Sequence, residues 1–203
     1  MTSLHSTKQA LRRSMRRERL LLAEHERMAM SAVIVDRVVA LPEIQQARAV
    51  HCYLSIAALG EVATEMLLTK LHSMGKQLMV PVVESDGLRS VCYYPSMPLQ
   101  KGEFGQPEPV ERVVADESQL DAVIVPLVAF DTKGQRLGYG KGYYDRFFNH
   151  LLKQHRAPQR IGLAFLMQHV ATLPAELWDQ PLDMVVHEKG VLRFSGSVGR
   201  EIV

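Results

Sequence analysis

The chain has 203 residues, of which 47% are hydrophobic and 23% charged, and its formal net charge is +2. This length and apolar fraction suit a single domain over residues 1–203 with one buried core. The small net charge gives no reason to expect a nucleic-acid-binding protein, and no apolar run reaches the roughly 18 residues that a membrane helix needs. The amino terminus lacks the apolar stretch of a signal peptide, so we expect a cytoplasmic protein.

The two cysteines and the eight histidines give no sign of a disulfide or a zinc site. Cys52 and Cys92 both lie in apolar, strand-like runs, where free structural thiols fit a reducing cytosol better than a disulfide does. His150 and His155 are five positions apart, which places them off a common helix face. A zinc site built on two histidines of one helix is therefore not expected.

A basic segment near the amino terminus is predicted to form an amphipathic helix over residues 7–22. Thr7 can cap its first turn, and apolar residues recur behind it at helical spacing. Four cations fall along one face of this helix: Lys8, Arg12, Arg16 and Arg19. This face is either a solvated surface or a cationic clamp for phosphates. The second interpretation requires a phosphate site elsewhere in the chain.

The rest of the chain alternates between helical and strand-like patterns. Further helices are predicted at residues 24–40, 62–74 and 141–154. Strands are predicted at residues 49–54, 77–83, 88–94, 121–128, 161–165 and 184–187, with a loop at 95–109. Because strands alternate with helices, we expect an α/β fold with an open, mostly parallel sheet and helices on both faces, a Rossmann-like three-layer α/β/α arrangement.

A glycine-rich segment follows the strand at 121–128, on the edge of the sheet where ligands collect. Its three alternating glycines let the backbone approach a ligand, and the helix that begins after them adds a partial positive charge. Arg136 and Lys141 add full charges, and Asp145 lies in the first helical turn, where a carboxylate can hold Mg²⁺. The segment fits a phosphate site and, equally, a tight turn that packs the helix on the sheet.

The glycine spacing matches neither of the two common phosphate-binding loops. A P-loop requires Gly-x4-Gly-Lys followed by Ser or Thr, but Gln135 stands five positions before Gly140, and Gly142 follows the lysine. A dinucleotide-binding loop requires Gly-x-Gly-x-x-Gly, whereas the spacing here is Gly-x-Gly-x-Gly. A phosphate site in this segment must therefore belong to another family.

The run from Pro126 to Phe148 closely resembles the signature of 5-formyltetrahydrofolate cyclo-ligases, also called methenyltetrahydrofolate synthetases. That signature is an apolar strand, Ala-Phe-Asp, a short turn and Arg-Leu-Gly-x-Gly-x-Gly-Tyr-Tyr-Asp-Arg. The resemblance extends over essentially the whole chain and includes the Gly60-Glu61-Val62 turn and the Trp178-Asp179 pair. It implies a ligase that uses ATP and Mg²⁺ to convert 5-formyltetrahydrofolate to 5,10-methenyltetrahydrofolate through an imidate phosphate, releasing ADP and phosphate.

The resemblance also implies the residues that handle ATP and Mg²⁺. Lys8 and Arg12 would clamp the phosphates, and Arg136, Lys141 and Asp145 would be catalytic. The glycine segment would line the phosphates with Arg136, Leu137, Gly138, Tyr139, Gly140, Lys141, Gly142, Tyr143 and Tyr144. Asp145 and Asp179 would hold Mg²⁺, with Asp183 as the alternative second ligand. The segment that contains Asp179 is also consistent with a polar connecting loop that binds no metal.

For the folate, the resemblance implies a pocket formed by Ile56, Glu61, Phe104, Tyr139 and Tyr143, although each aromatic side chain also suits the core. The chain departs from the family's usual residues at Ala63, Val82 and His187. All of these departures concern the substrate side. We expect small-molecule substrates, no nucleic acid, no membrane, and a monomer or weak dimer.

Two other functions remain open from the sequence. A sugar-phosphate isomerase or a CoA-transferase-like enzyme on a related sheet would need a catalytic carboxylate or lysine beside the glycine segment and no nucleotide. A nucleic-acid-binding module would use the basic first helix, and its binding would depend steeply on salt.

Overall fold

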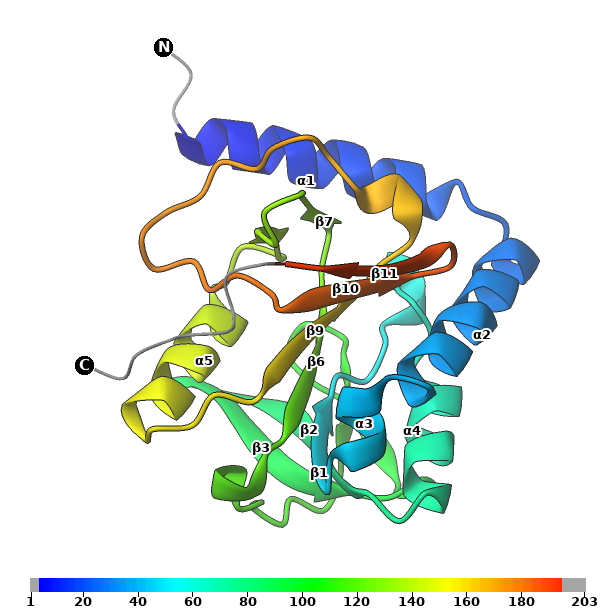
Figure 1. Ribbon diagram of the computed structural model, residues 1–203, viewed down its shortest axis with the longest axis vertical. Helices are drawn as coiled ribbons and strands as arrows, with labels where there is room; N and C mark the ends of the chain where they lie inside the picture. The colour runs from blue at the N-terminus through cyan, green and yellow to red at the C-terminus, as the bar shows by residue number, and fades with distance from the viewer. Residues whose placement is uncertain (1–3, 195–203) are drawn as a thin grey trace.

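A seven-stranded sheet forms the centre of the computed structural model, which describes residues 4–194 (Figure 1). The strands lie in the order β11-β10-β9-β6-β1-β2-β3. Their bounds are β1 Ala49–Cys52, β2 Gln77–Glu84, β3 Gly87–Tyr93, β6 Ala122–Pro126, β9 Gln159–Leu163, β10 Met184–His187 and β11 Gly190–Arg193. The strands from β10 to β2 are parallel, and β3 and β11 run antiparallel at the two edges. The predicted mostly parallel sheet is confirmed; the ends of the predicted domain, 1–3 and 195–203, lie outside the described residues.

Helices cover both faces of this sheet, as predicted (Figure 1). On one face lie α2 (Glu24–Val39), α3 (Pro42–Gln46) and α4 (Glu65–Ser73), and on the other lies α5 (Tyr143–Lys153). Successive strand side chains point to opposite faces. In β1, Val50 accordingly joins the core under α2 and α4, whereas Ala49 joins the core under α5. The sheet is therefore buried on both sides, which leaves its strand ends as the place for a site.

The first helix, α1 (Leu4–Leu20), crosses the top of the molecule in Figure 1, on the side where the parallel strands end. The predicted bounds of 7–22 were wrong, and Thr7 lies inside the helix instead of capping it. No glycine or proline stands between Leu4 and Thr7, so nothing in the sequence stops the helix there. The predicted apolar stripe exists, because Met15 is buried in a small cluster with Val128 and Leu173.

Two predicted helix starts were too early, and each has a local cause. The helix predicted at 62–74 begins only at Glu65, because the Thr64 hydroxyl donates to the carbonyl of Tyr53 and ties this segment to the end of β1. The helix predicted at 141–154 begins at Tyr143, since Gly142 has a left-handed φ of 66° that no helix residue adopts. The helix at 24–40 is confirmed to within one residue.

Two short hairpins were not predicted. Strands β4 (Leu99–Lys101) and β5 (Pro107–Pro109) pair inside the segment predicted as a loop at 95–109. Strands β7 (Ala129–Phe130) and β8 (Arg136–Leu137) pair directly after β6 and turn the chain back toward the glycine segment. Single-turn 3₁₀ helices lie at η1 Ala57–Leu59, η2 Glu117–Gln119 and η3 Leu166–Gln168. Both hairpins border the pocket described below.

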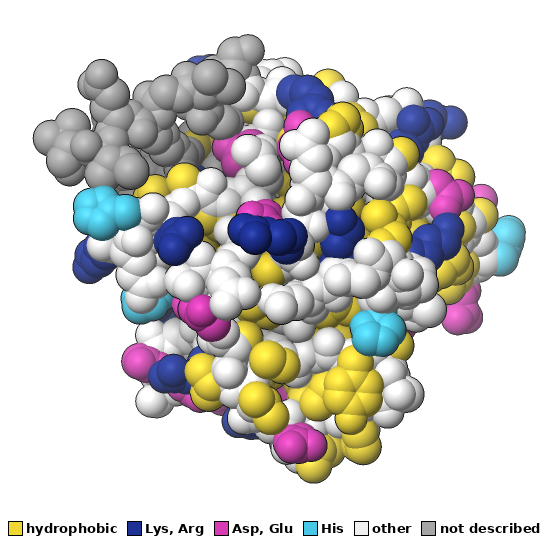
Figure 2. Space-filling model, turned by 60° about the horizontal axis from the view of Figure 1, so that its bottom comes forward, with side chains coloured by type: hydrophobic (Ala, Val, Ile, Leu, Met, Phe, Trp, Pro, Cys, Tyr) yellow, Lys and Arg dark blue, Asp and Glu magenta, His cyan; other side chains and the backbone are white. Residues whose placement is uncertain are grey.

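The surface carries mixed charges on the face shown in Figure 2, where basic side chains are interspersed with acidic and uncharged ones. Within residues 4–194, no helix has both the length and the apolar character needed to cross a membrane. Cys52 is buried and Cys92 exposed, and both are free thiols. Burial raises the pKa of the Cys52 thiol, which keeps it protonated and unreactive.

Candidate active site

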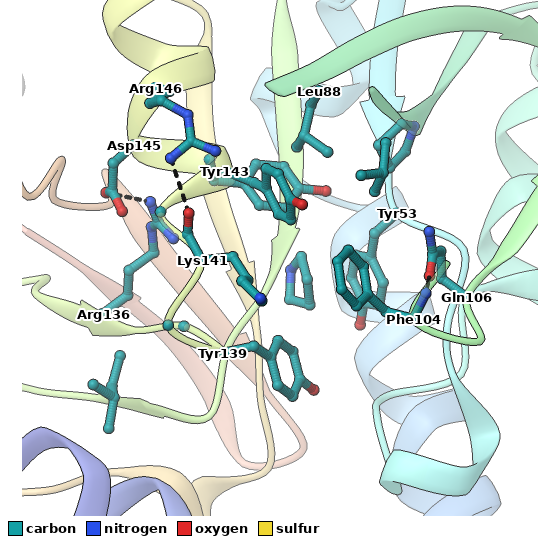
Figure 3. Close-up of a pocket in the computed structure, with 18 of the residues that line it drawn as sticks. Tyr53, Leu88, Phe104, Gln106, Arg136, Tyr139, Lys141, Tyr143, Asp145 and Arg146 are labelled. Carbon is teal, nitrogen blue, oxygen red and sulfur yellow. Dashed lines mark hydrogen bonds and ion pairs between the residues drawn. The ribbon is translucent and has the colours of Figure 1, made fainter. Parts of the chain in front are cut away.

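A pocket of about 620 Å³ opens where the parallel strands end, between α1, the glycine segment and the β4–β5 hairpin (Figure 3). It brings together every residue that the sequence suggested for the site, apart from the alternative ligand Asp183: Lys8, Arg12, Ile56, Glu61, Phe104, Arg136, Leu137, Gly138, Tyr139, Gly140, Lys141, Gly142, Tyr143, Tyr144, Asp145 and Asp179. These residues come from five separate parts of the chain. The fold thus joins the basic helix to the glycine segment, as the clamp interpretation required.

The glycine segment needs its glycines for backbone shape and for close approach. Gly140 and Gly142 have φ angles of 100° and 66°, which residues other than glycine rarely adopt. A Cβ atom on Gly140 would lie 3.3 Å from the guanidinium carbon of Arg12. The Nε atom of Arg12 donates a 2.8 Å hydrogen bond to the carbonyl of Gly138. Helix α1 therefore contacts the glycine segment through Arg12, the cation that the family resemblance assigned to phosphate.

A buried arginine forms one wall of the pocket. The Arg136 side chain is 5% exposed, and its Nη2 lies 2.6 Å from Oδ1 of Asp145 (Figure 3). The same Asp145 oxygen accepts a hydrogen bond from the backbone N–H of Gln180. Burial lowers the pKa of the Arg136 guanidinium, and the carboxylates of Asp145 and Asp179 act against that effect. Arg136 thus carries a fixed positive charge that interacts with both predicted Mg²⁺ ligands, Asp145 and Asp179.

A second ion-pair cluster holds Lys8, which also lines the pocket. Its Nζ lies 2.8 Å from a carboxylate oxygen of Glu176 and 2.8 Å from one of Asp179. Burial opposes the charge on Lys8, but the hydrogen bonds that it donates to Asp179 and Glu176 leave its pKa above the ordinary value. Lys8 belongs to the predicted basic helix face but is almost buried. The interpretation of that face as a solvated surface is therefore wrong for Lys8.

The two alternatives for the second Mg²⁺ ligand lie in different places. Asp179 lines the pocket, whereas Oδ2 of Asp183 accepts a 2.7 Å hydrogen bond from the backbone N–H of Arg160, outside the pocket. Among the described residues, no group of three or more His, Cys, Asp or Glu side chains is arranged to hold a metal. Mg²⁺ commonly uses only one or two carboxylates together with phosphate oxygens and water. Asp145 and Asp179 fit that pattern.

Glu61 also lines the pocket and is 4% exposed. Its Oε2 accepts a 2.7 Å hydrogen bond from the backbone N–H of Ile56, and its Oε1 accepts one from the Tyr139 hydroxyl. Burial raises the pKa of the Glu61 carboxyl, while these two hydrogen bonds act in the opposite direction. The carboxylate is therefore held in one orientation toward the pocket.

Aromatic rings and cations flank the pocket near the β4–β5 hairpin (Figure 3). The rings of Phe104 and Tyr143 lie with their centroids 6.1 Å apart. Lys141 Nζ is 5.2 Å from the centroid of Phe104, and the Arg146 guanidinium is 5.1 Å from that of Tyr143. Flat apolar surfaces of this kind suit a ring system with a polar edge. The arrangement groups the aromatic side chains that the sequence suggested for folate.

Several lining residues were missed by the sequence interpretation. They include Tyr53, Leu88, Gln106, Arg146, Glu176 and Trp178. Glu176 could have been suspected from its place three residues before Asp179 in a proline-bounded loop. Tyr53 and Leu88 carry no such signal, because their role depends on which strands become neighbours.

The fold and this pocket define an α/β enzyme whose site lies at the carboxyl ends of a parallel sheet. The model of the 5-formyltetrahydrofolate cyclo-ligase family matches residues 4–188, and the chain belongs to this family of ligases. It is 33% identical to the Haemophilus influenzae 5-formyltetrahydrofolate cyclo-ligase over 180 residues, covering 86% of this chain and 94% of that protein. It is 35% identical to the Escherichia coli K12 protein of the same name over 176 residues, covering 84% and 94%.

Solved structures agree with this assignment. The NMR structure of Aquifex aeolicus 5,10-methenyltetrahydrofolate synthetase superposes with a TM-score of 0.79 at 34% identity, covering 96% of this chain and 95% of that one. The synthetase of Mycoplasma pneumoniae gives a TM-score of 0.72 at 26% identity, covering 89% and 98%. The expected family and fold are both confirmed.

Proposed function

We propose that this ligase closes 5-formyltetrahydrofolate to 5,10-methenyltetrahydrofolate, using ATP and Mg²⁺ and releasing ADP and phosphate. The observation that carries the proposal is the pocket itself, which is lined by two groups of residues. The cation-flanked glycine segment, which we call the phosphate end, suits a triphosphate. The buried Glu61 and its neighbours, which we call the folate end, suit a ring with N–H donors. A chain of the cyclo-ligase family needs both to meet in one place.

The chemistry requires activation of an amide-like oxygen that is a poor leaving group. The formyl oxygen attacks the γ-phosphorus of ATP, the bond to the β-phosphate oxygen breaks, and ADP leaves. The nitrogen at position 10 then attacks the formyl carbon of the imidate phosphate. The carbon–oxygen bond breaks, phosphate leaves with the former formyl oxygen, and N10 loses its proton. Such a sequence needs positioning and charge stabilisation more than a protein nucleophile.

The phosphate end supplies that stabilisation. We assign the backbone N–H groups from Gly138 to Gly142 and the side chains of Arg12 and Arg136 to the phosphate oxygens. Lys8 adds a third positive charge, and Lys141 assists at the mouth of the pocket. Because Arg136 and Lys8 are already held by carboxylates, they are positioned before the nucleotide arrives.

We assign Mg²⁺ to Asp145 and Asp179. The contacts of Asp145 to Arg136 and Gln180 fall on its Oδ1, and those of Asp179 to Lys8 and Glu176 fall on its Oδ2. The other oxygen of each carboxylate is the one we propose as a ligand. When bound there, the ion supplies charge neutralisation for the phosphate oxygens.

At the folate end, Glu61 would accept hydrogen bonds from the N–H groups of the pterin. Ile56 would pack on the pterin, Tyr139 would hold Glu61, and Phe104 with Tyr143 would contact the aromatic part of the substrate. Membership of the cyclo-ligase family favours this function over an isomerase or a CoA-transferase-like enzyme. Lys8 and Arg12 line the pocket, which favours a role there over nucleic-acid binding.

The test is a direct assay of the purified chain with 5-formyltetrahydrofolate, ATP and Mg²⁺. We expect the ultraviolet absorbance of the methenyl product to appear together with an equal amount of ADP, and to require both ATP and Mg²⁺. A folded chain that forms no product from fresh substrate would refute the proposed function.

A further inference from the structure

Arg19 is a buried cation at the end of α1 that none of the roles above uses. It is 2% exposed, and it lies behind the pocket wall instead of lining the cavity. The sequence placed it on one helix face with Lys8, Arg12 and Arg16, and in the structure it is buried and does not line the cavity. A buried arginine carries a large desolvation cost, so its hydrogen-bond partners indicate what it is retained for.

The hydrogen-bond partners of Arg19 are oxygen atoms on segments at the edge of the pocket. Nε donates to the Leu59 carbonyl at 2.9 Å, and Nη1 donates to the Leu127 carbonyl at 3.1 Å. Nη2 donates to the Tyr139 hydroxyl at 2.9 Å. These acceptors belong to the turn after β1, the end of β6 and the glycine segment. The donors of the planar guanidinium are spread over three nitrogens, and each nitrogen here donates to a different segment.

The turn that presents Glu61 also packs on the Arg19 side chain. Gly60 has a left-handed φ of 65°, and a Cβ atom placed there would lie 3.6 Å from Cγ of Arg19 and 3.5 Å from its carbonyl oxygen. The residue directly before Glu61 is therefore in close contact with Arg19. Arg19 thus lies beside the residue that precedes Glu61, and it donates to Tyr139, the hydrogen-bond partner of the Glu61 carboxylate.

Proton counting fixes the direction of the hydrogen bonds. A guanidinium can only donate, so the Tyr139 oxygen accepts from Arg19. The single phenolic proton then goes to Oε1 of Glu61, which must accept it. Oε2 accepts from the Ile56 N–H. In this order both Glu61 oxygens accept, as those of an ionised carboxylate do, and their remaining lone pairs are available to donors in the pocket.

We propose that Arg19 is a positioning residue for the folate end, acting through the Tyr139 hydroxyl to keep Glu61 an oriented, ionised acceptor for the N–H donors of the substrate ring. This role rests on the proposed function. This role differs from that of Lys8 and Arg12 on the same helix, which we assign to the phosphates of ATP. Loss of Arg19 accordingly weakens folate binding more than ATP binding.

The test compares Arg19→Met, Tyr139→Phe and the double variant, with the exposed Arg17→Met on the same helix as the control. We expect each single variant to raise the KM for 5-formyltetrahydrofolate about tenfold, the cost of one hydrogen bond to a charged group. The KM for ATP should change by less than about twofold on the same scale. Since both changes break one chain of hydrogen bonds, the double variant should lose little more than either single one.

Additive losses in the double variant, or equal increases of both KM values in Arg19→Met, would show that Arg19 only stabilises the fold. If Arg19→Met does not fold, Tyr139→Phe decides, because an unchanged folate KM in that variant contradicts the proposal. A wild-type chain without turnover refutes the proposed function and this role together. A wild-type chain with normal turnover and unselective variants refutes the role alone.

Discussion

The two ends of the pocket are built in different ways. At the phosphate end, Lys8 and Arg136 are paired with the carboxylates of Asp179 and Asp145, whose side chains are 18% and 21% exposed. At the folate end, Glu61, Tyr139 and Arg19 form a hydrogen-bonded chain in which Glu61 and Arg19 are almost fully buried. The two carboxylates reach solvent and can therefore contact an arriving ligand, while Lys8 and Arg136 beside them are almost buried. A buried chain of hydrogen bonds keeps its geometry.

The difference suggests that the phosphate end provides charge and the folate end provides shape and orientation. Variants at the two ends should therefore separate in steady-state kinetics. Changes at the phosphate end should affect turnover and the KM for ATP, and changes at the folate end should affect the KM for 5-formyltetrahydrofolate.

The largest effect is expected for Asp145→Asn. The substitution removes the proposed Mg²⁺ ligand and leaves the buried Arg136 without its carboxylate partner. We expect kcat/KM to fall by about 100-fold or more, on the scale of lost charge stabilisation in a transition state. Steady-state rates over a range of Mg²⁺ concentrations measure it, with Asp183→Asn as the matched control. Equal losses in both variants would contradict the assignment of Asp145 to the ion.

Lys8→Met should raise the KM for ATP about tenfold, as expected for one charge-assisted contact to phosphate, and leave the folate KM within about twofold. The matched control is Arg13→Met, which removes an exposed cation from the same helix. Initial rates at varied ATP and fixed folate measure the effect. A Lys8 variant with an unchanged KM for ATP would remove Lys8 from the phosphate site.

Glu61→Gln should show the reverse pattern. The amide keeps the shape of the side chain but replaces an acceptor with a donor, so we expect the folate KM to rise about tenfold while the KM for ATP stays within about twofold. Varied folate at saturating ATP gives the measurement. An equal rise of both values would mean that the two ends of the pocket are not independent.

The smallest effect is expected for Phe104→Leu at the mouth of the pocket. Phe104 is 42% exposed, and its removal costs only part of one aromatic contact. We expect the folate KM to rise by about threefold, the equivalent of somewhat less than 1 kcal/mol, with an unchanged Tm. Thermal unfolding and initial rates check both statements. A tenfold loss would make Phe104 a central contact instead.

Local patterns in the sequence predicted the sheet, most helices and the segments that meet in the pocket. The glycine segment is one continuous run, and Lys8 and Arg12 are one helical turn apart, so their common role is visible at short range. Together with the family resemblance, these signals placed every suggested site residue in one pocket, the alternative Asp183 excepted.

The role of Arg19 could not be predicted in this way. Its acceptors at Leu59, Leu127 and Tyr139 are 40, 108 and 120 positions away, and helical spacing shows only that Arg19 shares a helix face with other cations. The hairpins β4–β5 and β7–β8 escaped detection because strands of two or three residues are too short to show an alternating pattern. The features that the sequence did not predict thus depend on hydrogen bonds between distant residues and on paired strands of two or three residues.

The transfer of the formyl oxygen is the most direct test of the account, because it requires ATP and folate to meet in this pocket. 5-Formyltetrahydrofolate labelled with ¹⁸O in the formyl group is converted by the enzyme in unlabelled water, and the released phosphate is examined by mass spectrometry. The account predicts that the label appears in inorganic phosphate, one atom for each methenyl product formed. Unlabelled phosphate, with the label recovered in water, would contradict phosphorylation of the formyl oxygen.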